Sequence, residues 1–424
     1  MADFSKANQL IEGFKGGAYL RGHGVLSRVG ELVGDFGKRA ALVRDVFPGS
    51  DQFAGKITGS LKSAGVDVVG TIDGAAPNAP REDLARITAE ITELNPDFYV
   101  SFGGGSTIDA AKAADVLRSL GGGIDDYFGV GLVTKALADS GKKLSPHVAI
   151  QTVSSSAAHL TKYSNITDLE TGQKKLIVDE AIVPPRAVFD YEVSFGAPMA
   201  LTADGALDGV AHSLEVLYGA VGLPHYELMT DVARETFDLV LQYLPRVLEN
   251  PSDAEAREAL AIGTDLGGYA IMLGGTNGAH LTSFSLIDVL SHGRACIMMN
   301  PYYSVFYAPA IEEPLKIIGA SLERVGTLRA GETDAAAREA GMAVADAIRK
   351  FETKVAIPTT LGEVSGFGNH HIDRALNAAK NPQLKMKLQN MPIPLTAELV
   401  DDYMGPVLEA GKTGDLNLIK NLAH

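Results

Sequence analysis

The chain has 424 residues, 46% hydrophobic and 21% charged, a composition typical of a globular protein of two or three domains. Its 37 Lys and Arg residues against 52 Asp and Glu residues give a formal net charge of −15, and no basic run interrupts this acidic background. Nucleic acids and anionic membranes bind clustered cations, so we expect neither as a partner. The single cysteine, Cys296, excludes an internal disulfide and favours a reducing, cytoplasmic location.

The first half of the chain alternates short apolar runs with helical patterns. Gly, Pro or charged residues bound each apolar run, as is typical of buried strands; the runs are 40–43, 66–69, 98–102, 148–150 and 187–189. Between them, residues 81–94 place Leu84, Ile87, Ile91 and Leu94 on one helical face. This alternation predicts an α/β domain with a parallel sheet over residues 1–196.

The second half predicts helices alone, in a domain spanning residues 197–424. Residues 226–244 form a long helical pattern that Pro245 ends or kinks, residues 333–351 form another, and residues 397–404 a shorter one stopped by Gly405 and Pro406. Residues 266–287 carry no charge, but five glycines and several polar side chains argue against a membrane helix and favour a buried helix pair.

A glycine-rich turn follows the apolar run at 98–102. The segment FYVSFGGGSTIDAAK predicts a strand, three glycines, and a helix beginning near Asp109. Glycines allow a close backbone approach, and the N–H groups at a helix start face an anion, so the turn suits a phosphate. It lacks the spacing of the Rossmann and P-loop motifs, and an ordinary strand-to-helix turn remains an equal alternative.

Two later segments carry candidate metal ligands. Asp208 and His212 are four residues apart, so on a helix they lie on one face and can share a metal. His280 and His292 follow in the apolar segment NGAHLTSFSLIDVLSHG. One carboxylate and three imidazoles suit Fe²⁺ or Zn²⁺ better than Ca²⁺ or Mg²⁺, although each pair alone could be a structural polar contact.

In this order and spacing, GGGS, D-x-x-x-H-x-x-E and a histidine-bearing segment ending in HG closely resemble the iron-containing (group III) alcohol dehydrogenase family. Further similar segments are the strand ALVRD ending in Asp45, the turn at Pro77 and Asn78, residues 151–168, and Pro184 with Asp190. The resemblance covers nearly the whole chain. It implies the dehydroquinate synthase-like fold class: an α/β dinucleotide-binding domain with a parallel sheet, then an all-α metal-binding domain.

The resemblance also implies functional residues. Asp208, His212, His280 and His292 match the metal ligands and would act in catalysis through the metal. Asp45 matches an aspartate that accepts ribose hydroxyls and disfavours a 2′-phosphate, so NAD is expected over NADP. The residues expected to line the cofactor site are Asn78, Gly103, Gly104, Gly105, Ser106, Thr152, Ser156, Thr161 and Lys174, with Lys175 as the alternative to Lys174.

Two departures from the family pattern bear on chemistry. The family often carries a histidine four residues after its third ligand, where this chain has Phe284, so proton transfer through that histidine is not expected here. His280 and His292 are also two residues closer in sequence than usual. The aromatic ring of Phe284 favours small, weakly polar alcohols over polyols. Cys296 is interpreted as a small buried hydrophobe.

The resulting hypothesis is a metal-dependent NAD(H) alcohol dehydrogenase or aldehyde reductase acting on a small alcohol or carbonyl by hydride transfer. A bound Fe²⁺ or Zn²⁺ would act as a Lewis acid. Alternatives are a glycerol-type polyol dehydrogenase, a dehydroquinate synthase-like cyclising enzyme, a maleylacetate reductase, or a non-catalytic nucleotide-binding protein. A homodimer or higher homo-oligomer is expected by resemblance, with the apolar N-terminal residues Leu10, Ile11, Phe14, Tyr19 and Leu20 in need of cover.

Overall fold

The computed structural model describes residues 3–422, which divide into two compact units. One unit is Ile11–Pro198, and the other joins the described residues of Met1–Leu10 to those of Met199–His424. The start of the chain belongs to the second unit because it contacts that unit's helix α7 (Tyr226–Glu249): the rings of Phe4 and Tyr243 lie 5.8 Å apart, and Lys6 pairs with Asp231 at 2.7 Å. Helix α1 (Ser5–Lys15) therefore spans the boundary between the units.

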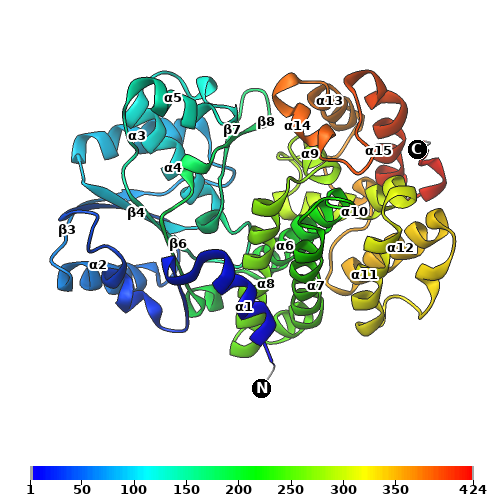
Figure 1. Ribbon diagram of the computed structural model, residues 1–424, viewed down its shortest axis with the longest axis horizontal. Helices are drawn as coiled ribbons and strands as arrows, with labels where there is room; N and C mark the ends of the chain where they lie inside the picture. The colour runs from blue at the N-terminus through cyan, green and yellow to red at the C-terminus, as the bar shows by residue number, and fades with distance from the viewer. Residues whose placement is uncertain (1–2, 423–424) are drawn as a thin grey trace. The chain divides into compact units, whose positions relative to one another are not determined.

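The first unit is built on a six-stranded sheet (Figure 1). Its spatial order is β1 (Tyr19–Gly22), β9 (Arg186–Asp190), β6 (His147–Gln151), β4 (Phe98–Gly103), β2 (Arg39–Arg44) and β3 (Asp67–Asp73). Every neighbouring pair is parallel, so the predicted α/β fold class with a parallel sheet is confirmed. The five predicted apolar runs all fall within or beside these strands.

Both faces of this sheet are covered by helices (Figure 1). On one face, Leu42, Val100 and Ile150 pack against Ile57 and Leu61 of α2 (Ser50–Ser63) and against the 3₁₀ segment Val25–Leu32. The other face packs against α3 (Arg81–Leu94) and α4 (Gly105–Leu120). Strands covered on both faces need apolar residues along most of their length, which is why the central strands β9, β6, β4 and β2 appear in the sequence as hydrophobic runs.

A second, three-stranded sheet in the order β5-β8-β7 was not predicted. Strands β7 (Tyr163–Asp168) and β8 (Gln173–Val178) form an antiparallel hairpin, β5 (Gly129–Val130) pairs with β8, and α5 (Leu132–Ser140) follows β5. The buried ammonium of Lys112 fixes the segment before the hairpin by donating to the carbonyls of Ala158, Thr161 and Tyr163 at 2.7, 2.8 and 2.8 Å.

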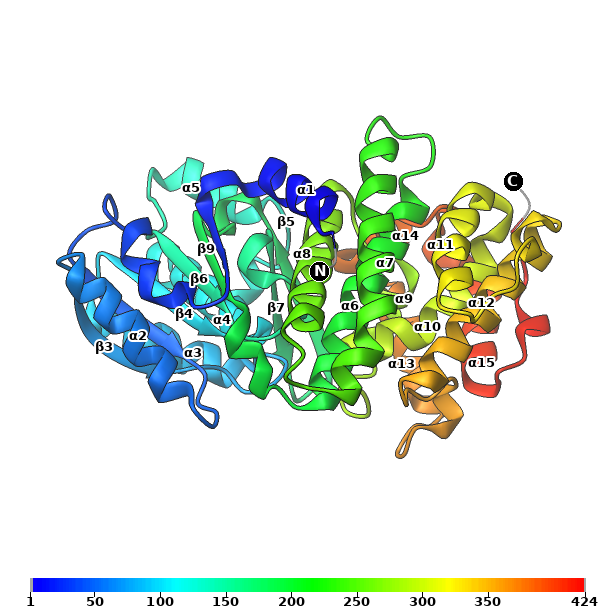
Figure 2. The same ribbon diagram turned by 90° about the horizontal axis from the view of Figure 1, so that it is seen from below.

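The second unit is helical. Helices α6 (Met199–Gly219), α7 and α8 (Ala254–Leu273) lie side by side (Figure 2). A Cβ on Gly267 of α8 would lie 2.7 Å from the Cα of Gly209 on α6, so glycine permits this close helix contact. The remaining helices are α9 (Gly278–Ser283), α10 (His292–Tyr307), α11 (Glu312–Arg324), α12 (Ala337–Lys354), α13 (Asn369–Ala379), α14 (Lys385–Gln389) and α15 (Gly405–Thr413).

Two predicted boundaries are wrong, and of the two alternatives given for Pro245 the end of the helix is excluded. The helix of the glycine-rich turn begins at Gly105 rather than near Asp109. Helix α7 continues through Pro245 to Glu249. Gly405 and Pro406 begin α15 instead of ending a helix, because a proline in the first turn loses no helical hydrogen bond. The uncharged stretch 266–287 forms the end of α8 and the whole of α9, and within residues 3–422 we find no helix of the length and hydropathy that crossing a bilayer requires.

Glu352 of α12 is a buried carboxyl group in an apolar part of the helical core. Neither carboxyl oxygen has a hydrogen-bond partner within residues 3–422, and the side chain borders a cavity of about 10 Å³ with Leu207, Ile297 and Phe351. Burial raises the pKa of Glu352 well above its usual value. Between the unfolded pKa and this raised pKa the folded state binds more protons, so we expect this group to lower the free energy of unfolding as pH rises from about 4.5.

Glu352→Gln is therefore expected to flatten the pH dependence of stability. Relative to wild type, its free energy of unfolding rises by up to about 1.4 kcal/mol per pH unit above pH 4.5. Urea unfolding at pH 4, 6 and 8 measures the difference, with Glu339→Gln at an exposed position of the same helix as control. A difference that is constant across this range would contradict the protonated-carboxyl interpretation.

Candidate metal centre and nucleotide site

The glycine-rich turn lies at the carboxyl edge of the parallel sheet. It leaves β4 between β2 and β6, with Gly103 paired to Gln151 and the Asp45 N–H bonded to the Phe102 carbonyl at 2.9 Å. Helix α4 begins within the turn, at Gly105. In open α/β sheets this edge is where ligands bind, and the exposed N–H groups at the start of the helix favour an anion.

Asp45 holds this turn in place. One carboxylate oxygen accepts the Gly104 N–H at 2.8 Å and the other accepts the Thr107 hydroxyl. A Cβ on Gly103 would lie 2.8 Å from the Asp45 carboxyl carbon, so a side chain at that position would clash. Burial raises the pKa of Asp45, while these two hydrogen bonds oppose that rise. Asp45 therefore has a structural task beside the ribose contact predicted from the sequence.

The other predicted nucleotide residues belong to the same unit, and several are bonded to one another. Ser106 Oγ accepts the Asn78 N–H at 3.0 Å, and Lys174 Nζ donates to Asn78 Oδ1 at 3.1 Å. Lys174 is buried, whereas the alternative Lys175 pairs with Asp125 at 3.0 Å, which favours Lys174 for the cofactor site.

Thr152 and Ser156 contact the turn from the segment after β6, whereas Thr161 contacts helix α4 through Lys112. The Thr152 N–H donates to the Gly103 carbonyl at 3.2 Å, and a Cβ on Gly105 would lie 2.7 Å from Ser156 Oγ. The Thr161 carbonyl accepts from Lys112. The turn is thus enclosed by the residues that the sequence assigned to the nucleotide, and their contact with a nucleotide stays a prediction.

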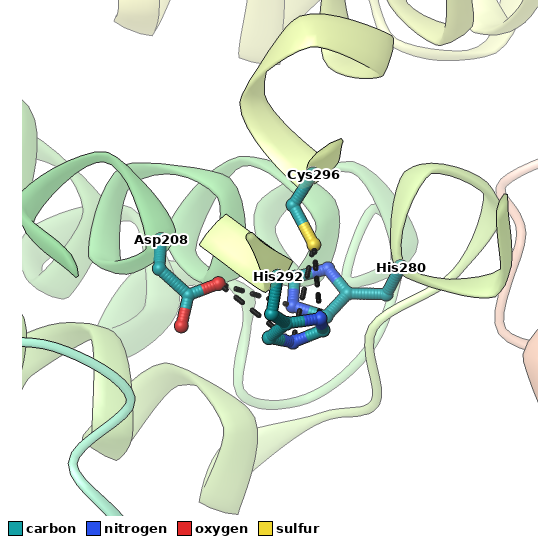
Figure 3. Close-up of side chains that lie close together, drawn as sticks. All are labelled: Asp208, His280, His292 and Cys296. Atoms are coloured by element: carbon teal, nitrogen blue, oxygen red, sulfur yellow. Dashed lines mark hydrogen bonds and ion pairs between the residues drawn. The ribbon is translucent and has the colours of Figure 1, made fainter. Parts of the chain in front are cut away.

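In the helical unit, the four predicted metal ligands lie near one another, and three of them, Asp208, His280 and His292, bring ligand atoms within 4.8 Å of one another. Asp208 and His212 lie one turn apart on α6, with His212 Nε2 3.8 Å from Asp208 Oδ2. His280 on α9 and His292 at the start of α10 place their Nε2 atoms 3.7 and 3.9 Å from Asp208 Oδ1 (Figure 3). Gly293 allows α10 to begin there, because a Cβ would lie 2.1 Å from the Asp204 carbonyl oxygen.

These separations suit a shared metal ion. Distances of 3.7 to 3.9 Å are too long for hydrogen bonds between nitrogen and oxygen. Two ligand atoms that each bind one metal at about 2.1 Å can lie up to about 4.2 Å apart. Asp208, His212 and His280 are buried almost completely, and His292 is partly exposed. Such burial is expected for a site that keeps water away. The donor set and its spacing therefore fit a divalent transition metal.

Cys296 also faces this cluster. It follows His292 by one turn of α10, and its sulfur lies 3.9 Å from Nδ1 and 4.0 Å from Nε2 of that histidine (Figure 3). Ligand atoms of Asp208, His280, His292 and Cys296 all lie within 4.8 Å of one another. The predicted ligand His212 is not part of this group; it contacts Asp208 and the ring of His280. The sequence interpretation of Cys296 as a small buried hydrophobe was incomplete: the residue is buried, and it also offers a sulfur donor to the same site.

Glu215 orients one of the histidines and was not among the predicted site residues. Its carboxylate accepts from His280 Nδ1 at 2.5 Å, from the Asn277 N–H at 2.7 Å and from the His280 N–H at 3.3 Å. A proton held on Nδ1 leaves the Nε2 lone pair for a metal. Burial raises the pKa of Glu215 to about 7, against the lowering effect of the Asn277 N–H. Its signal in the sequence was the Glu that ends D-x-x-x-H-x-x-E.

His292 has its own two supports. Ser283 Oγ lies 3.1 Å from its Nδ1. The ring of Phe284 stacks on the ring of His292, with 6.1 Å between centroids and 25° between planes. Phe284 thus lies against a predicted ligand, where the resemblance placed it, and it offers no proton-transfer group.

A parallel sheet with a glycine-rich turn at its carboxyl edge, together with a buried Asp/His cluster in a helical unit, defines a metal-dependent nucleotide-using oxidoreductase. Two family models match the chain: iron-containing alcohol dehydrogenase over residues 17–191, and the C-terminal region of the Fe-containing alcohol dehydrogenase family over residues 202–402. The chain belongs to the iron-containing alcohol dehydrogenase family.

Individual relatives agree with this assignment. The chain is 30% identical over 347 residues to the NAD-dependent methanol dehydrogenase of Bacillus methanolicus, covering 81% of this chain and 86% of that protein. It is 28% identical over 316 residues to the sulfoacetaldehyde reductase of Bilophila wadsworthia, covering 73% and 76%. A solved 1,3-propanediol oxidoreductase shares the fold with a TM-score of 0.78 at 24% identity, covering 93% of this chain and 97% of that one.

Proposed function

We propose that this protein interconverts a small alcohol and its aldehyde or ketone, with NAD(H) as hydride carrier and with Fe²⁺ or Zn²⁺ held by Asp208, His212, His280 and His292. The observation that carries the proposal is the spacing of the three histidines around Asp208, in a chain of the alcohol dehydrogenase family. The relatives named for NAD-dependent methanol oxidation and for sulfoacetaldehyde reduction support a small substrate.

In this proposal the helical unit holds the metal and the α/β unit binds the nucleotide. A divalent metal in such a site supplies a Lewis acid for the alcohol or carbonyl oxygen of the substrate. Glu215 keeps the proton of His280 on Nδ1, and Ser283 contacts Nδ1 of His292, so that both Nε2 atoms face Asp208. Phe284 and the buried helix ends around it exclude water. Asp45 and Ser106 hold the glycine-rich turn ready for the pyrophosphate.

A panel of small alcohols and aldehydes, assayed with NAD(H) and with Fe²⁺, Zn²⁺ or no added metal, tests this function. We expect activity that depends on the metal and that is lost with a chelator. Metal content of the purified protein separates the rivals: a non-catalytic nucleotide-binding protein or a maleylacetate reductase would carry no metal at these four side chains. Turnover of polyols alone would instead favour the glycerol-type alternative.

Asp45→Gly is expected to reduce the preference for NAD over NADP by about tenfold. A carboxylate near the adenosine ribose repels a 2′-phosphate by about 1–3 kcal/mol at surface-like dielectric, and the variant removes that charge. Because Asp45 also holds Gly104 and Thr107, Asp45→Asn is the better-matched variant, since its amide can keep one of these contacts without the charge. The ratio of kcat/KM for the two cofactors measures the effect. If the wild type uses NAD and NADP equally well, Asp45 does not determine the cofactor preference.

The assembly and location are proposed on the resemblance. We propose a cytoplasmic homodimer or larger homo-oligomer. Of the apolar residues near the N-terminus, Ile11 and Tyr19 are buried within the chain itself, while Leu10, Phe14 and Leu20 are partly exposed and available for a subunit contact. Light scattering at micromolar concentration gives the mass; a monomer would contradict the proposal.

A further inference from the structure

A buried lysine lies beside the metal cluster, and neither the family motifs nor the proposed ligands include it. Lys387 is on the short helix α14, which packs against α9, and only 2% of its surface is exposed. Its ammonium lies 5.5 Å from the centroid of the Phe284 ring, the ring that stacks on His292. Helix α14 thus brings a positive charge close to the aromatic ring that borders the cluster.

The partners of this ammonium do not neutralise it. Its hydrogen bond goes to the hydroxyl of Thr276, a neutral group, and no carboxylate within residues 3–422 lies at ion-pair distance from it. Glu215, Cys296 and Asp208 act on it at longer range, but Glu215 is already bonded to His280 and Asn277, and Cys296 and Asp208 face the proposed metal. An ammonium has three N–H donors, so the geometry leaves donors for another group.

Burying a charge without an opposite charge in contact is costly, and such groups cluster at functional sites. Burial lowers the pKa of Lys387 to about 8, against the raising effect of Glu215, Cys296 and Asp208. A structural role alone would not require a charge, because a neutral side chain of similar shape can pack under Phe284. The Lys387 charge therefore calls for an anion that is bound only part of the time.

We propose that Lys387 is a specificity-determining residue that binds an anionic substituent of the substrate, so that the enzyme prefers short aldehydes and alcohols carrying a carboxylate or a similar anionic oxo group. The inference rests on the proposed function and extends it to the substrate class. The reaction is unchanged: hydride passes from NADH to the carbonyl carbon, a proton is added to the oxygen, and the anionic group stays intact at the ammonium. It differs from the sequence expectation of weakly polar substrates, which considered Phe284 without the lysine behind it.

Matched aldehydes test this preference. Butanal and 4-oxobutanoate differ only in having a methyl group or a carboxylate at the far end, and acetaldehyde and glyoxylate form a shorter pair. In the metal-loaded wild type we expect a higher kcat/KM for the anionic member of at least one pair, expressed mainly in KM. A charge-assisted hydrogen bond corresponds to a factor of about 10–100.

Lys387→Met removes the charge and keeps the length of the side chain. We expect it to lower kcat/KM for the anionic aldehyde about 10–100-fold and to leave the neutral partner within about threefold. Lys385→Met, at an exposed position of the same helix, is the matched control and should change neither. Circular dichroism and metal content check that the variants fold and load.

The outcomes separate this inference from the function beneath it. Wild-type activity on neutral and anionic aldehydes alike overturns the preference, whether or not Lys387→Met folds, and leaves the proposed function standing. Equal loss of both activities in Lys387→Met makes the residue structural and also overturns the inference. Activity on no alcohol or aldehyde overturns both proposals.

Discussion

His212→Ala is expected to lose its bound metal and at least about a thousandfold in kcat/KM while keeping its fold. The metal supplies several kcal/mol of stabilisation to the charge that develops on the substrate oxygen, so losing it costs a factor of this size. His212 Nε2 is 3.8 Å from Asp208 Oδ2, and its ring stacks on that of His280 at 4.8 Å, so its removal opens the cluster on one side. The apolar face of α6 remains, which is why the helix should survive.

Metal content per chain, circular dichroism and the alcohol assay measure this result together. His370→Ala, at an exposed position on α13, is the control for removing a histidine and should behave as wild type. A His212→Ala protein that is folded, metal-free and fully active would exclude the metal centre as the catalytic site. One that retains its metal would indicate that Asp208, His280, His292 and Cys296 bind the ion without His212.

The central strands of the sheet could be predicted from the sequence because they are buried on both faces. The run Val148–Ile150, for example, is uniformly apolar, is bounded by polar residues and lies within β6. The β7–β8 hairpin gave no such signal. Its strands alternate buried and partly exposed residues over only six positions each, and Lys174 and Lys175 make β8 look like a surface segment. Lys174 is nevertheless buried against Asn78.

The site, like the fold, could be predicted from the sequence only in part. Asp208 and His212 are four residues apart on one helix, so local geometry alone predicts that they meet. Nothing local indicates that Lys387 lies beside Phe284, about a hundred residues away in sequence, because a KMK segment looks like a solvated helix face. Cys296 was misjudged for a related reason: its position one turn after His292 matters only once α10 is known to begin at that histidine.

Glu215→Gln is expected to weaken metal binding about 10–100-fold without removing any ligand. The carboxylate of Glu215 accepts a hydrogen bond from His280 Nδ1 at 2.5 Å and two more from the backbone N–H groups of Asn277 and His280. An amide in its place has one oxygen for these three donors. Its NH₂ group would face Nδ1, which favours a proton on Nε2, the atom that must bind the metal.

Competition with a metal chelator measures the affinity, and Ser283→Ala serves as the comparison at the other histidine. Ser283 contacts His292 Nδ1 through a neutral hydroxyl at 3.1 Å, so its removal should cost less than the loss of a carboxylate contact. We therefore expect the order wild type, Ser283→Ala, Glu215→Gln in decreasing affinity, with kcat falling in the same order at limiting metal and recovering in excess metal. If Glu215→Gln binds metal as tightly as wild type, the His280 tautomer is fixed by something other than Glu215, and the raised pKa of this carboxyl group serves another purpose.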